Sequence, residues 1–226
     1  MKSLTIAYLK SDGRNHEGRK TSFHRGGGFS KRYRRIDFAH MLKGLMAYVL
    51  KREYDPFRKT PIFLIYYENG FFSYHLGIYG VFQNMILWSG EGMPLWQGNS
   101  LPLYRLPIGS FLCNLVSKYA RSAGSKCQLL KQYENRVLVK LPSGEEKFFP
   151  SYVWATVGRI ARLSVRFEKK MKAGSKVRLG VRPRVRGVAM NPVDHPHGGG
   201  EGKTSGGRPS VSRWGKLTKG KKTRRR

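Results

Sequence analysis

Short, β-prone apolar runs separated by turn signals dominate the hydrophobic pattern in the middle of the chain. Residues 62–67 (IFLIYY) are continuously apolar, and Asn69-Gly70 separates them from a second run at 71–74. An Asn-Gly pair between two such runs is the strongest short signal for a β-hairpin, because both turn residues then need positive φ. The pattern therefore predicts a hairpin over residues 62–74.

The same kind of pattern recurs toward the C-terminal half. Residues 136–141 and 145–149 flank the turn-forming sequence PSG and predict a second hairpin. Stretches that contain Pro or Gly at 99–103 and 106–110 punctuate further short strands, and more strands are predicted at 151–160 and 175–179. Many short strands at roughly 8–12 residue spacing are typical of small β-barrels. We expect two barrels, which meet near residues 97–100.

The helical pattern is weak everywhere except over residues 38–50. The uncharged stretch at 71–88 (FFSYHLGIYGVFQNMILW) is long enough to raise the alternative of a membrane span. Its Ser, His, Gln and Asn side chains, its glycines and the polar tips of its Tyr and Trp rings favour two aromatic-rich strands instead. After Gly180 the apolar pattern stops.

Positive charge is concentrated at both ends of the chain. The formal net charge is +31, from 44 Lys and Arg against 13 Asp and Glu. Residues 1–35 hold 10 Lys and Arg with 2 acids, and residues 181–226 hold 13 with 2. Such a surplus repels itself unless a polyanion neutralises it, and nucleic acid is the commonest such partner. We expect a folded centre with two basic arms that take shape only on nucleic acid.

The chain has two cysteines, Cys113 and Cys127, which do not form a Cys-x-x-Cys pair. Two lone thiols indicate a reducing compartment or buried small apolar groups. The first ten residues lack the apolar run of a secretory signal and do not resemble a transit peptide.

Two short motifs in the tail suggest other chemistry, and their surroundings argue against it. The sequence GKT at 202–204 matches the end of an NTPase phosphate-binding loop, but His197 occupies the position where that motif needs its first glycine. His195 and His197 beside Asp194 resemble part of a metal site, yet neither a fourth ligand nor a cysteine cluster stands nearby. No nucleophile and base can be nominated from spacing, so we predict no enzymatic activity.

What remains in the tail is glycine and cations. Arg182, Arg184 and Arg186 alternate, so in an extended chain they face one way, and each guanidinium can bind a phosphate with two hydrogen bonds. Glycine lets a backbone approach RNA closely. Trp214 either stacks on a base or packs on a barrel, and the sequence does not distinguish the two.

The tail also contains a sixteen-residue run that is far more specific than any short motif. Residues 187–202 read GVAMNPVDHPHGGGEG and, with WG at 214–215 and TKGKKT at 218–223, resemble the C-terminal signature of ribosomal protein 2 of the large subunit. Further segments similar to that family are GRN at 13–15, GR at 18–19, HRGGG at 24–28, YRRIDF at 33–38, EYDP at 53–56, NSLP at 99–102, PIG at 107–109, ARSAG at 120–124 and GVRP at 180–183.

The resemblance implies a mainly β fold, with an OB-fold barrel followed by an SH3-like barrel and extended basic N- and C-terminal arms. The parts would be an N-terminal arm at 1–29, the OB-fold-like barrel at 30–97, the SH3-like barrel at 98–180 and an rRNA-threading tail at 181–226. It also implies a structural constituent of the large ribosomal subunit. Such a protein binds large-subunit rRNA near the peptidyl transferase centre and supports subunit assembly, subunit association and translation.

The expected partners are large-subunit rRNA and neighbouring ribosomal proteins, with no membrane span, small-molecule substrate, metal site or cofactor. Mg²⁺ associated with the rRNA is the one ion left open. A histidine that matches His195 has been considered catalytic in the family, but ribosomal chemistry is RNA-based, so we expect His195 to position RNA. We expect rRNA contacts from Arg14, Arg19, Lys20, His24, Arg25, Lys31, Arg32, Arg34, Arg35, Arg121, Arg182, Arg184, Arg186, Asn191, His195, His197, Lys203, Arg208, Arg213, Trp214, Lys216, Lys219, Lys221 and Lys222.

Departures from the family bear on origin. Family members usually have a longer N-terminal arm and a longer basic tail. Together with abundant Tyr and Phe, few Ala and no presequence, this favours a protein made inside a mitochondrion over one from a bacterial cytoplasm or a plastid. The aromatic stretch at 71–96 matches the family weakly, so we expect the outer face of the first barrel to contact a lineage-specific protein.

Two other classes of function stay in view. A general nucleic-acid chaperone or DNA-binding protein explains the charge but not the sixteen-residue run at 187–202. An NTPase explains only the sequence at 202–204, whose spacing is wrong.

Overall fold

The computed structural model describes residues 3–220 and 222. The chain divides into two compact units, Met1–Leu9 with Ser30–Lys169 and Lys10–Phe29 with Lys170–Arg226. The predicted mainly β fold is confirmed, because antiparallel strands account for most of the regular structure. The first unit holds the strands of both barrels, and the second joins the N-terminal arm to the tail.

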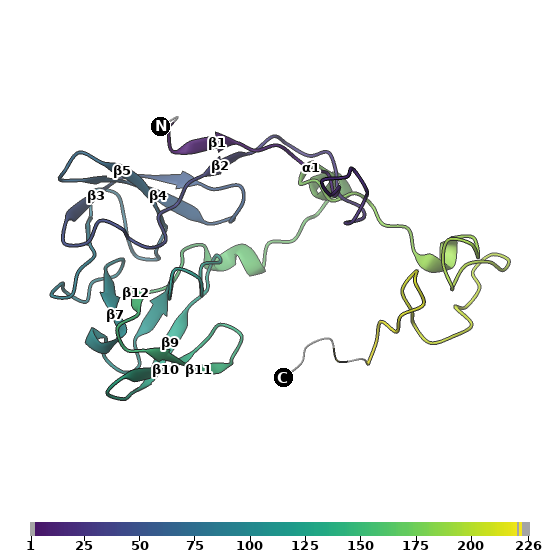
Figure 1. Cartoon of the computed structure of the whole chain (residues 1–226). Coiled ribbons are helices and arrows are strands. Elements are labelled where there is room, and N and C mark those ends of the chain that lie inside the picture. Colours follow the sequence, from purple (N-terminus) through teal and green to yellow (C-terminus); the bar gives the residue numbers. More distant parts are fainter. Residues whose placement is uncertain (1–2, 221, 223–226) are drawn as a thin grey trace. The chain divides into compact units, whose positions relative to one another are not determined.

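The first barrel is built on a four-stranded antiparallel sheet in the order β5–β4–β3–β6. Its strands are β3 (Met46–Tyr54), β4 (Pro61–Tyr67), β5 (Phe72–Leu76) and β6 (Ile86–Trp88). Figure 1 labels the strands β3, β4 and β5 of this sheet. The hairpin predicted over 62–74 is confirmed as β4–β5, and the two aromatic-rich strands predicted within 71–88 are β5 and β6. Within the described residues, no helix has the length and apolar character needed to cross a bilayer.

The turn of this hairpin differs from the expectation in one respect. Gly70 has a φ of +86°, whereas Asn69 does not adopt a positive φ. The Gly70 amide donates to the Tyr67 carbonyl at 2.9 Å, and the Tyr67 amide donates to the Phe71 carbonyl at 2.9 Å. These two bonds close a three-residue loop in which only the last residue needs the left-handed conformation.

The helix predicted over residues 38–50 is wrong, because β3 begins inside it. Gly44 has a φ of +81°, which interrupts any helix before the strand starts. Residues 46–49 are alternately half-buried and buried, as expected for a strand paired with β4 on one side and β6 on the other. Apolar residues on both faces of a strand also fit the spacing of a helix. Pairing with β4 and β6 favours the strand over the helix here.

A small strand pair covers part of this sheet. β1 (Thr5–Ala7) pairs antiparallel with β2 (Arg32–Arg34). Leu4 and Ile36, which flank these strands, pack against a buried cluster on β4 and β5 formed by Ile62, Leu64 and Tyr74. Residues 5–7, which are predicted to belong to the N-terminal arm, thus lie in the first unit.

The second barrel is a six-stranded antiparallel sheet in the order β11–β10–β9–β8–β12–β7. Its strands are β7 (Ser100–Pro102), β8 (Phe111–Cys113), β9 (Cys127–Gln132), β10 (Arg136–Lys140), β11 (Glu146–Pro150) and β12 (Trp154–Val157), with the 3₁₀ helices η1 (Leu103–Arg105) and η2 (Leu163–Arg166). The hairpin predicted over 136–149 is confirmed as β10–β11, and the strand predicted within 151–160 is β12. Leu112, Leu129 and Val137 are fully buried in its core.

The two barrels share their packing within the first unit. Cys113 and Ile160 of the second barrel belong to the core of the first. His40 bridges the barrels, because its Nδ1 lies 3.2 Å from Ser89 Oγ and its Nε2 lies 3.3 Å from Thr156 Oγ1. Both cysteines are buried and free, as the alternative of small apolar groups predicts.

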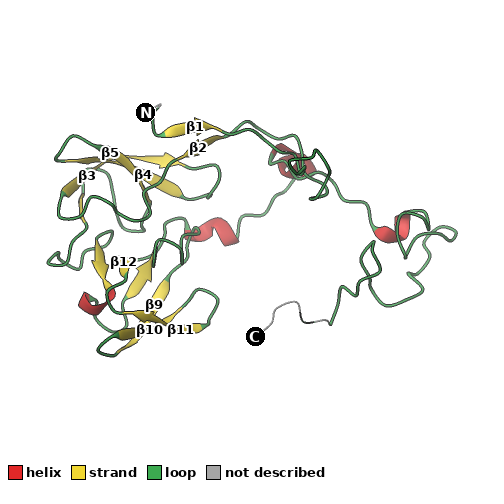
Figure 2. Ribbon diagram, in the orientation of Figure 1, coloured by secondary structure: helices red, strands yellow, loops and turns green. Residues whose placement is uncertain are grey.

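The second unit consists almost wholly of loops (Figure 2). Its helices are α1 (Ala173–Arg178) and the 3₁₀ turn η3 (Gly187–Ala189). The strand predicted at 175–179 is therefore wrong. Gly180 has a φ of +85° and its amide donates to the Val177 carbonyl at 2.9 Å, so it ends the helix as a C-terminal cap. The Ala, Lys and Arg residues before it are good helix formers.

Candidate nucleic-acid interface

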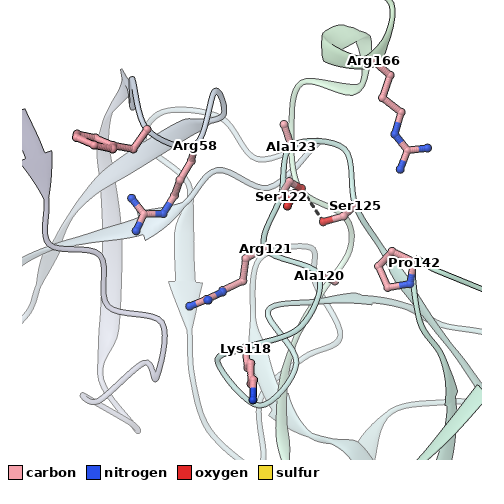
Figure 3. A pocket seen from close by; sticks show the side chains of 10 residues that line it. Arg58, Lys118, Ala120, Arg121, Ser122, Ala123, Ser125, Pro142 and Arg166 are labelled. Carbon is pink, nitrogen blue, oxygen red and sulfur yellow. Dashed lines mark hydrogen bonds between the residues drawn. The ribbon is translucent and has the colours of Figure 1, made fainter. Parts of the chain in front are cut away.

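A cleft in the first unit, called here the cationic cleft, brings four cationic side chains together. It is lined by Phe57, Arg58, Lys118, Ala120, Arg121, Ser122, Ala123, Ser125, Pro142 and Arg166. Figure 3 shows Lys118 and Arg121 on the loop that continues into Ser122 and Ser125, and Arg58 and Arg166 on two other segments. Ser125 Oγ donates to the Ser122 carbonyl at 2.6 Å. Because none of these lining residues is acidic, the cleft concentrates positive potential.

Arg58 is held at the cleft by a buried carboxylate. Its Nη1 donates to Oδ2 of Asp55 at 2.6 Å, and its Nη2 donates to the Tyr33 hydroxyl at 3.2 Å. The Asp55 side chain is fully buried. Partial burial alone lowers the pKa of Arg58, but the hydrogen bonds to Asp55 and Tyr33 outweigh it and raise the pKa above its ordinary value. Arg58 is thus an ordered, permanent cation, which loses little conformational entropy on binding an anion.

Phe38 joins the cations of the two barrels. The guanidinium carbons of Arg58 and Arg121 lie 5.2 and 4.4 Å from the centroid of its ring. The Phe38 carbonyl accepts hydrogen bonds from Asn114 Nδ2 at 2.7 Å and from Ser117 Oγ at 2.9 Å. One residue of the first barrel therefore holds Arg58, Arg121 and a loop of the second barrel in place.

Three of the segments that carry the family resemblance meet at this cleft. Residues 33–38 supply Tyr33 and Phe38, residues 53–56 supply Asp55, and residues 120–124 supply Arg121. Guanidinium groups match phosphate oxygens with paired hydrogen bonds, and an aromatic ring such as Phe57 accepts a stacked base. The cleft therefore fits a segment of RNA backbone.

In the second unit, the N-terminal arm and the tail are paired through their backbones. The Gly26 amide donates to the Gly180 carbonyl at 3.1 Å, and the Arg182 amide donates to the His24 carbonyl at 3.0 Å. A Cβ atom on Gly28 would lie 2.7 Å from the Gly180 nitrogen, which is closer than real contacts allow. Glycine at position 28 is therefore required by the close approach of two backbones.

The sixteen-residue run folds back on itself. The Gly199 amide donates to the Met190 carbonyl at 3.1 Å, and a Cβ on Gly198 would lie 2.3 Å from the Asn191 carbonyl oxygen. Gly199 has a φ of +92°, and a Cβ there would lie 2.9 Å from Cγ of Pro192. The glycines thus allow close packing within the loop itself.

His195 and His197 help to hold this loop. The His197 amide donates to Nδ1 of His195 at 3.0 Å, and the Val211 amide donates to Nε2 of His197 at 3.3 Å. Across residues 3–220 and 222, no group of three His, Cys, Asp or Glu side chains is placed to hold a metal ion. In the same range, the GKT sequence at 202–204 has neither a strand before it nor a helix after it, so it lacks the geometry of a phosphate-binding loop.

A cavity in the second unit, called here the tail cavity, gathers several predicted contact residues. Phe23 and Asp194 also line it. The Arg213 guanidinium carbon lies 4.8 Å from the Phe23 ring centroid and 5.5 Å from that of Trp214. Trp214 is 67% exposed, so its ring is accessible to a stacking base. The predicted residues that line this cavity are His24, Arg184, Arg186, His195, Arg213 and Trp214.

The other predicted contact residues are mostly exposed. Lys221 lies outside the described residues. Arg121 lines the cationic cleft, and Lys31, Arg32, Arg34 and Arg35 lie in or beside β2. Residues of the second unit with exposed or half-buried side chains outside the tail cavity are Arg14, Arg19, Lys20, Arg25, Arg182, Asn191, His197, Lys203, Arg208, Lys216, Lys219 and Lys222.

Arg34 serves the barrel itself. Its Nε lies 3.9 Å from Oε2 of Glu53, and its side chain is only 21% exposed. Glu53 also accepts a hydrogen bond from the Tyr74 hydroxyl at 2.8 Å and lies 3.1 Å from Lys51 Nζ. Partial burial alone raises the pKa of Glu53, but these hydrogen bonds and the charge of Arg34 lower it below its ordinary value. The carboxylate thus stays charged and holds Arg34 on the sheet.

Sequence reasoning missed three of the four cations of the cationic cleft, namely Arg58, Lys118 and Arg166. Arg58 offers a signal, because it follows Asp55 by three residues and adjoins the family segment at 53–56. Lys118 offers a similar signal, because it lies two residues before the family segment at 120–124, whereas Arg166 offers none, since isolated cations are common in a chain with 44 Lys and Arg. Only the fold brings them to one place.

Comparison with known protein families gives two matches that together span most of the chain. A family model described as the RNA-binding N-terminal domain of ribosomal proteins L2 matches residues 1–88. A second, described as the C-terminal domain of ribosomal proteins L2, matches residues 96–215.

Individual relatives align over nearly the whole chain. The large ribosomal subunit protein uL2m of Reclinomonas americana is 45% identical over 231 residues, which cover 99% of this chain and 83% of the relative. The large ribosomal subunit protein uL2 of Rickettsia typhi is 46% identical, with 100% of this chain and 85% of the relative covered. The uL2 protein of Wolbachia pipientis wMel is also 46% identical and is covered over 84% of its length.

Proposed function

The chain belongs to the ribosomal protein L2 family, and we propose that its cationic cleft and its tail cavity hold large-subunit rRNA near the peptidyl transferase centre. The protein is a structural constituent of the large ribosomal subunit, as its relatives' names and RNA-binding domains indicate. In this role it supports subunit assembly, subunit association and translation. Its partners are rRNA and neighbouring ribosomal proteins.

The observation that carries the residue-level proposal is the construction of the cationic cleft. Arg58 and Arg121 are positioned by Asp55 and Phe38, and these residues come from three segments shared with the family. A cationic surface that only kept the protein soluble would not need a buried carboxylate or a ring between two guanidiniums. Ordered cations in a cleft fit the fixed phosphates of a folded RNA.

The role of the protein is structural in this proposal, and the ribosomal chemistry stays with the RNA. One ring nitrogen of His195 and one of His197 accept hydrogen bonds from backbone amides, which supports a positioning role for the loop at 187–202. We assign no protein-held cofactor or metal. Mg²⁺ bound to the rRNA neutralises those phosphates that the protein leaves uncovered.

A mitochondrial large subunit is the proposed location. A mitochondrial relative at 45% identity supports it, although bacterial relatives reach 47%. The abundance of aromatic residues, with 12 Tyr and 12 Phe, is the additional reason for choosing the organelle. Fractionation of the source cells tests the choice, because a protein confined to the cytoplasm or plastid would contradict it.

Sucrose-gradient sedimentation tests the function directly. Tagged chain should co-sediment with large subunits and stay with them through a moderate-salt wash. Recovery only in free fractions would favour a general nucleic-acid chaperone or DNA-binding protein. ATP turnover that disappears in the Lys203→Ala variant would instead favour an NTPase.

A further inference from the structure

The first barrel carries a row of apolar side chains on the outer face of its sheet, called here the aromatic row. Tyr66 on β4 lies opposite Phe72 on β5 and opposite Tyr48 on β3, and Tyr48 lies opposite Ile86 on β6. Residues directly opposite each other in an antiparallel sheet share a face, so these four side chains form one line across all four strands. The Tyr66 and Phe72 rings are 5.0 Å apart.

This face of the sheet is covered at one end and open at the other. Two residues along from the row, Leu64 and Tyr74 are buried beneath Leu4 and Ile36. In the row itself, Phe72 and Ile86 are each 37% exposed, and Tyr48 and Tyr66 are half-buried. The residues beside β1 and β2 thus cover one end of this face, and the other end stays apolar and accessible.

The charge around the row is unlike that of the rest of the chain. Residues 61–104 contain no Lys or Arg and two acids, Glu68 and Glu91, in a chain of net charge +31. Both acids are exposed, and Glu68 directly follows β4, two residues after Tyr66. The cation nearest to the row along β3 is Lys51, whose Nζ lies 3.1 Å from Glu53.

These charges decide between possible occupants. Aromatic platforms that stack bases lie in positively charged grooves that track the phosphates, and the row has no such groove. A second copy of the chain would bring together two molecules of net charge +31. A neighbouring protein of the same rRNA particle needs Lys and Arg for its own RNA contacts, and these complement Glu68 and Glu91.

We infer that the aromatic row, flanked by Glu68, is a docking surface for an apolar segment of a neighbouring protein that carries Lys or Arg beside its apolar side chains. The inference rests on the proposed function, because it places the chain among other rRNA-bound proteins. The segment would extend the cover that Leu4 and Ile36 begin on the same face.

Photo-crosslinking in assembled large subunits tests this surface. A benzophenone amino acid replaces Phe72 in the full chain, and the subunits are purified on gradients before irradiation. Cross-links should form to protein, at peptides that mass spectrometry maps to apolar stretches containing Lys or Arg. Cross-links to rRNA, cross-links to a second copy of the chain, or none in intact subunits would each overturn the docking surface.

Charge variants at a neighbouring position give a second readout. Ile86→Lys should reduce the protein cross-link from position 72 more than Ile86→Glu does, because the partner is basic. The opposite order would show that the partner is acidic and would overturn the inference. Tyr152→Lys is the matched control, since Tyr152 is a 70% exposed aromatic residue outside the row, and it should leave the cross-link unchanged.

The gradient separates this inference from the proposed function. A chain that never enters large subunits would contradict the proposed function. A chain that enters them but cross-links to rRNA from position 72 would contradict only the docking surface.

Discussion

At the scale of single residues, the cationic cleft depends on one buried ion pair. Asp55 is fully buried, and Arg58 lies 2.6 Å from its carboxylate. We predict that Asp55→Asn lowers the free energy of unfolding by about 3–5 kcal/mol, because removing one partner leaves a partly buried charge without compensation. Urea unfolding measures the change. Glu168→Gln is the matched control, because it removes the carboxylate that pairs with Arg162 and that is more exposed than Asp55. It should lower the free energy of unfolding by about 1 kcal/mol or less.

Gly28 tests the pairing of the arm with the tail. Gly28 and Gly18 have almost the same φ, +77° and +78°, but only Gly28 would bring a Cβ against backbone. Both Ala substitutions carry the strain of a positive φ, so any additional loss in Gly28→Ala reports the close approach to Gly180. With the chain bound to large-subunit rRNA, we expect hydrogen-exchange protection of the Gly26 amide to fall in Gly28→Ala and to persist in Gly18→Ala. Equal protection in the two variants would show that the backbones are not in contact.

The loop at 187–202 offers a similar comparison. Gly199→Val places a β-branched residue at a φ of +92° and against Pro192, whereas Gly202→Val faces open space at a φ of +58°. We expect Gly199→Val to reduce the amount of assembled large subunit more strongly than Gly202→Val. Quantification of subunit peaks on gradients measures both. Normal subunit levels in Gly199→Val would count against tight packing of this loop.

At the scale of elements, two buried histidines make the free energy of unfolding of the first unit depend on pH. Burial lowers the pKa of His40 to about 4, against the opposing charge of Asp37. Burial, and after it the proximity of His40, lowers the pKa of His75 well below its ordinary value. The unfolded chain therefore binds both protons near pH 6.5, whereas the folded chain excludes the His40 proton until about pH 4 and the His75 proton until the pH is well below 6.5.

The sign of the effect follows from this difference in bound protons. Their contribution to stability is complete above pH 6.5. The contribution of His40 is lost as the pH falls from 6.5 toward about 4, by about 1.4 kcal/mol per pH unit, and that of His75 is also lost as the pH falls below 6.5. The unfolding free energy of His40→Gln should change less between pH 7 and pH 5 than that of the unaltered chain. An identical pH dependence in the two proteins would contradict the assignment of His40 as a buried neutral group.

The elements also show how far a single sequence predicts this fold. The hairpins β4–β5 and β10–β11 follow from local turn chemistry, so they are predictable. The start of β3 is not, because its pairing partners β4 and β6 lie up to about forty residues away along the chain and override a local helical pattern. α1 is missed because a six-residue helix presents too short a pattern to recognise.

At the scale of the whole molecule, charge is divided among surfaces with different partners. The tail cavity and the cationic cleft collect cations, and residues 61–104 contain none. Composition and motifs predict the RNA-contact residues of the tail, because glycine and cationic residues are the commonest types in the tail. They do not predict the cleft, whose cations come from segments distant in sequence that only the folded barrels bring together. The pairing of arm and tail is also absent from any local pattern.

The central claim is that ordered cations of this chain neutralise rRNA phosphates, and the salt dependence of binding to isolated large-subunit rRNA tests it most directly. Replacing Arg182, Arg184 and Arg186 with Ala should weaken binding and lower the slope of log K against log salt by about 0.7–0.9 for each phosphate that the variant no longer neutralises. Arg52→Ala, an exposed cation on β3 outside both sites, should leave the slope nearly unchanged. A slope that stays the same in the triple variant, or falls equally in Arg52→Ala, would contradict the account.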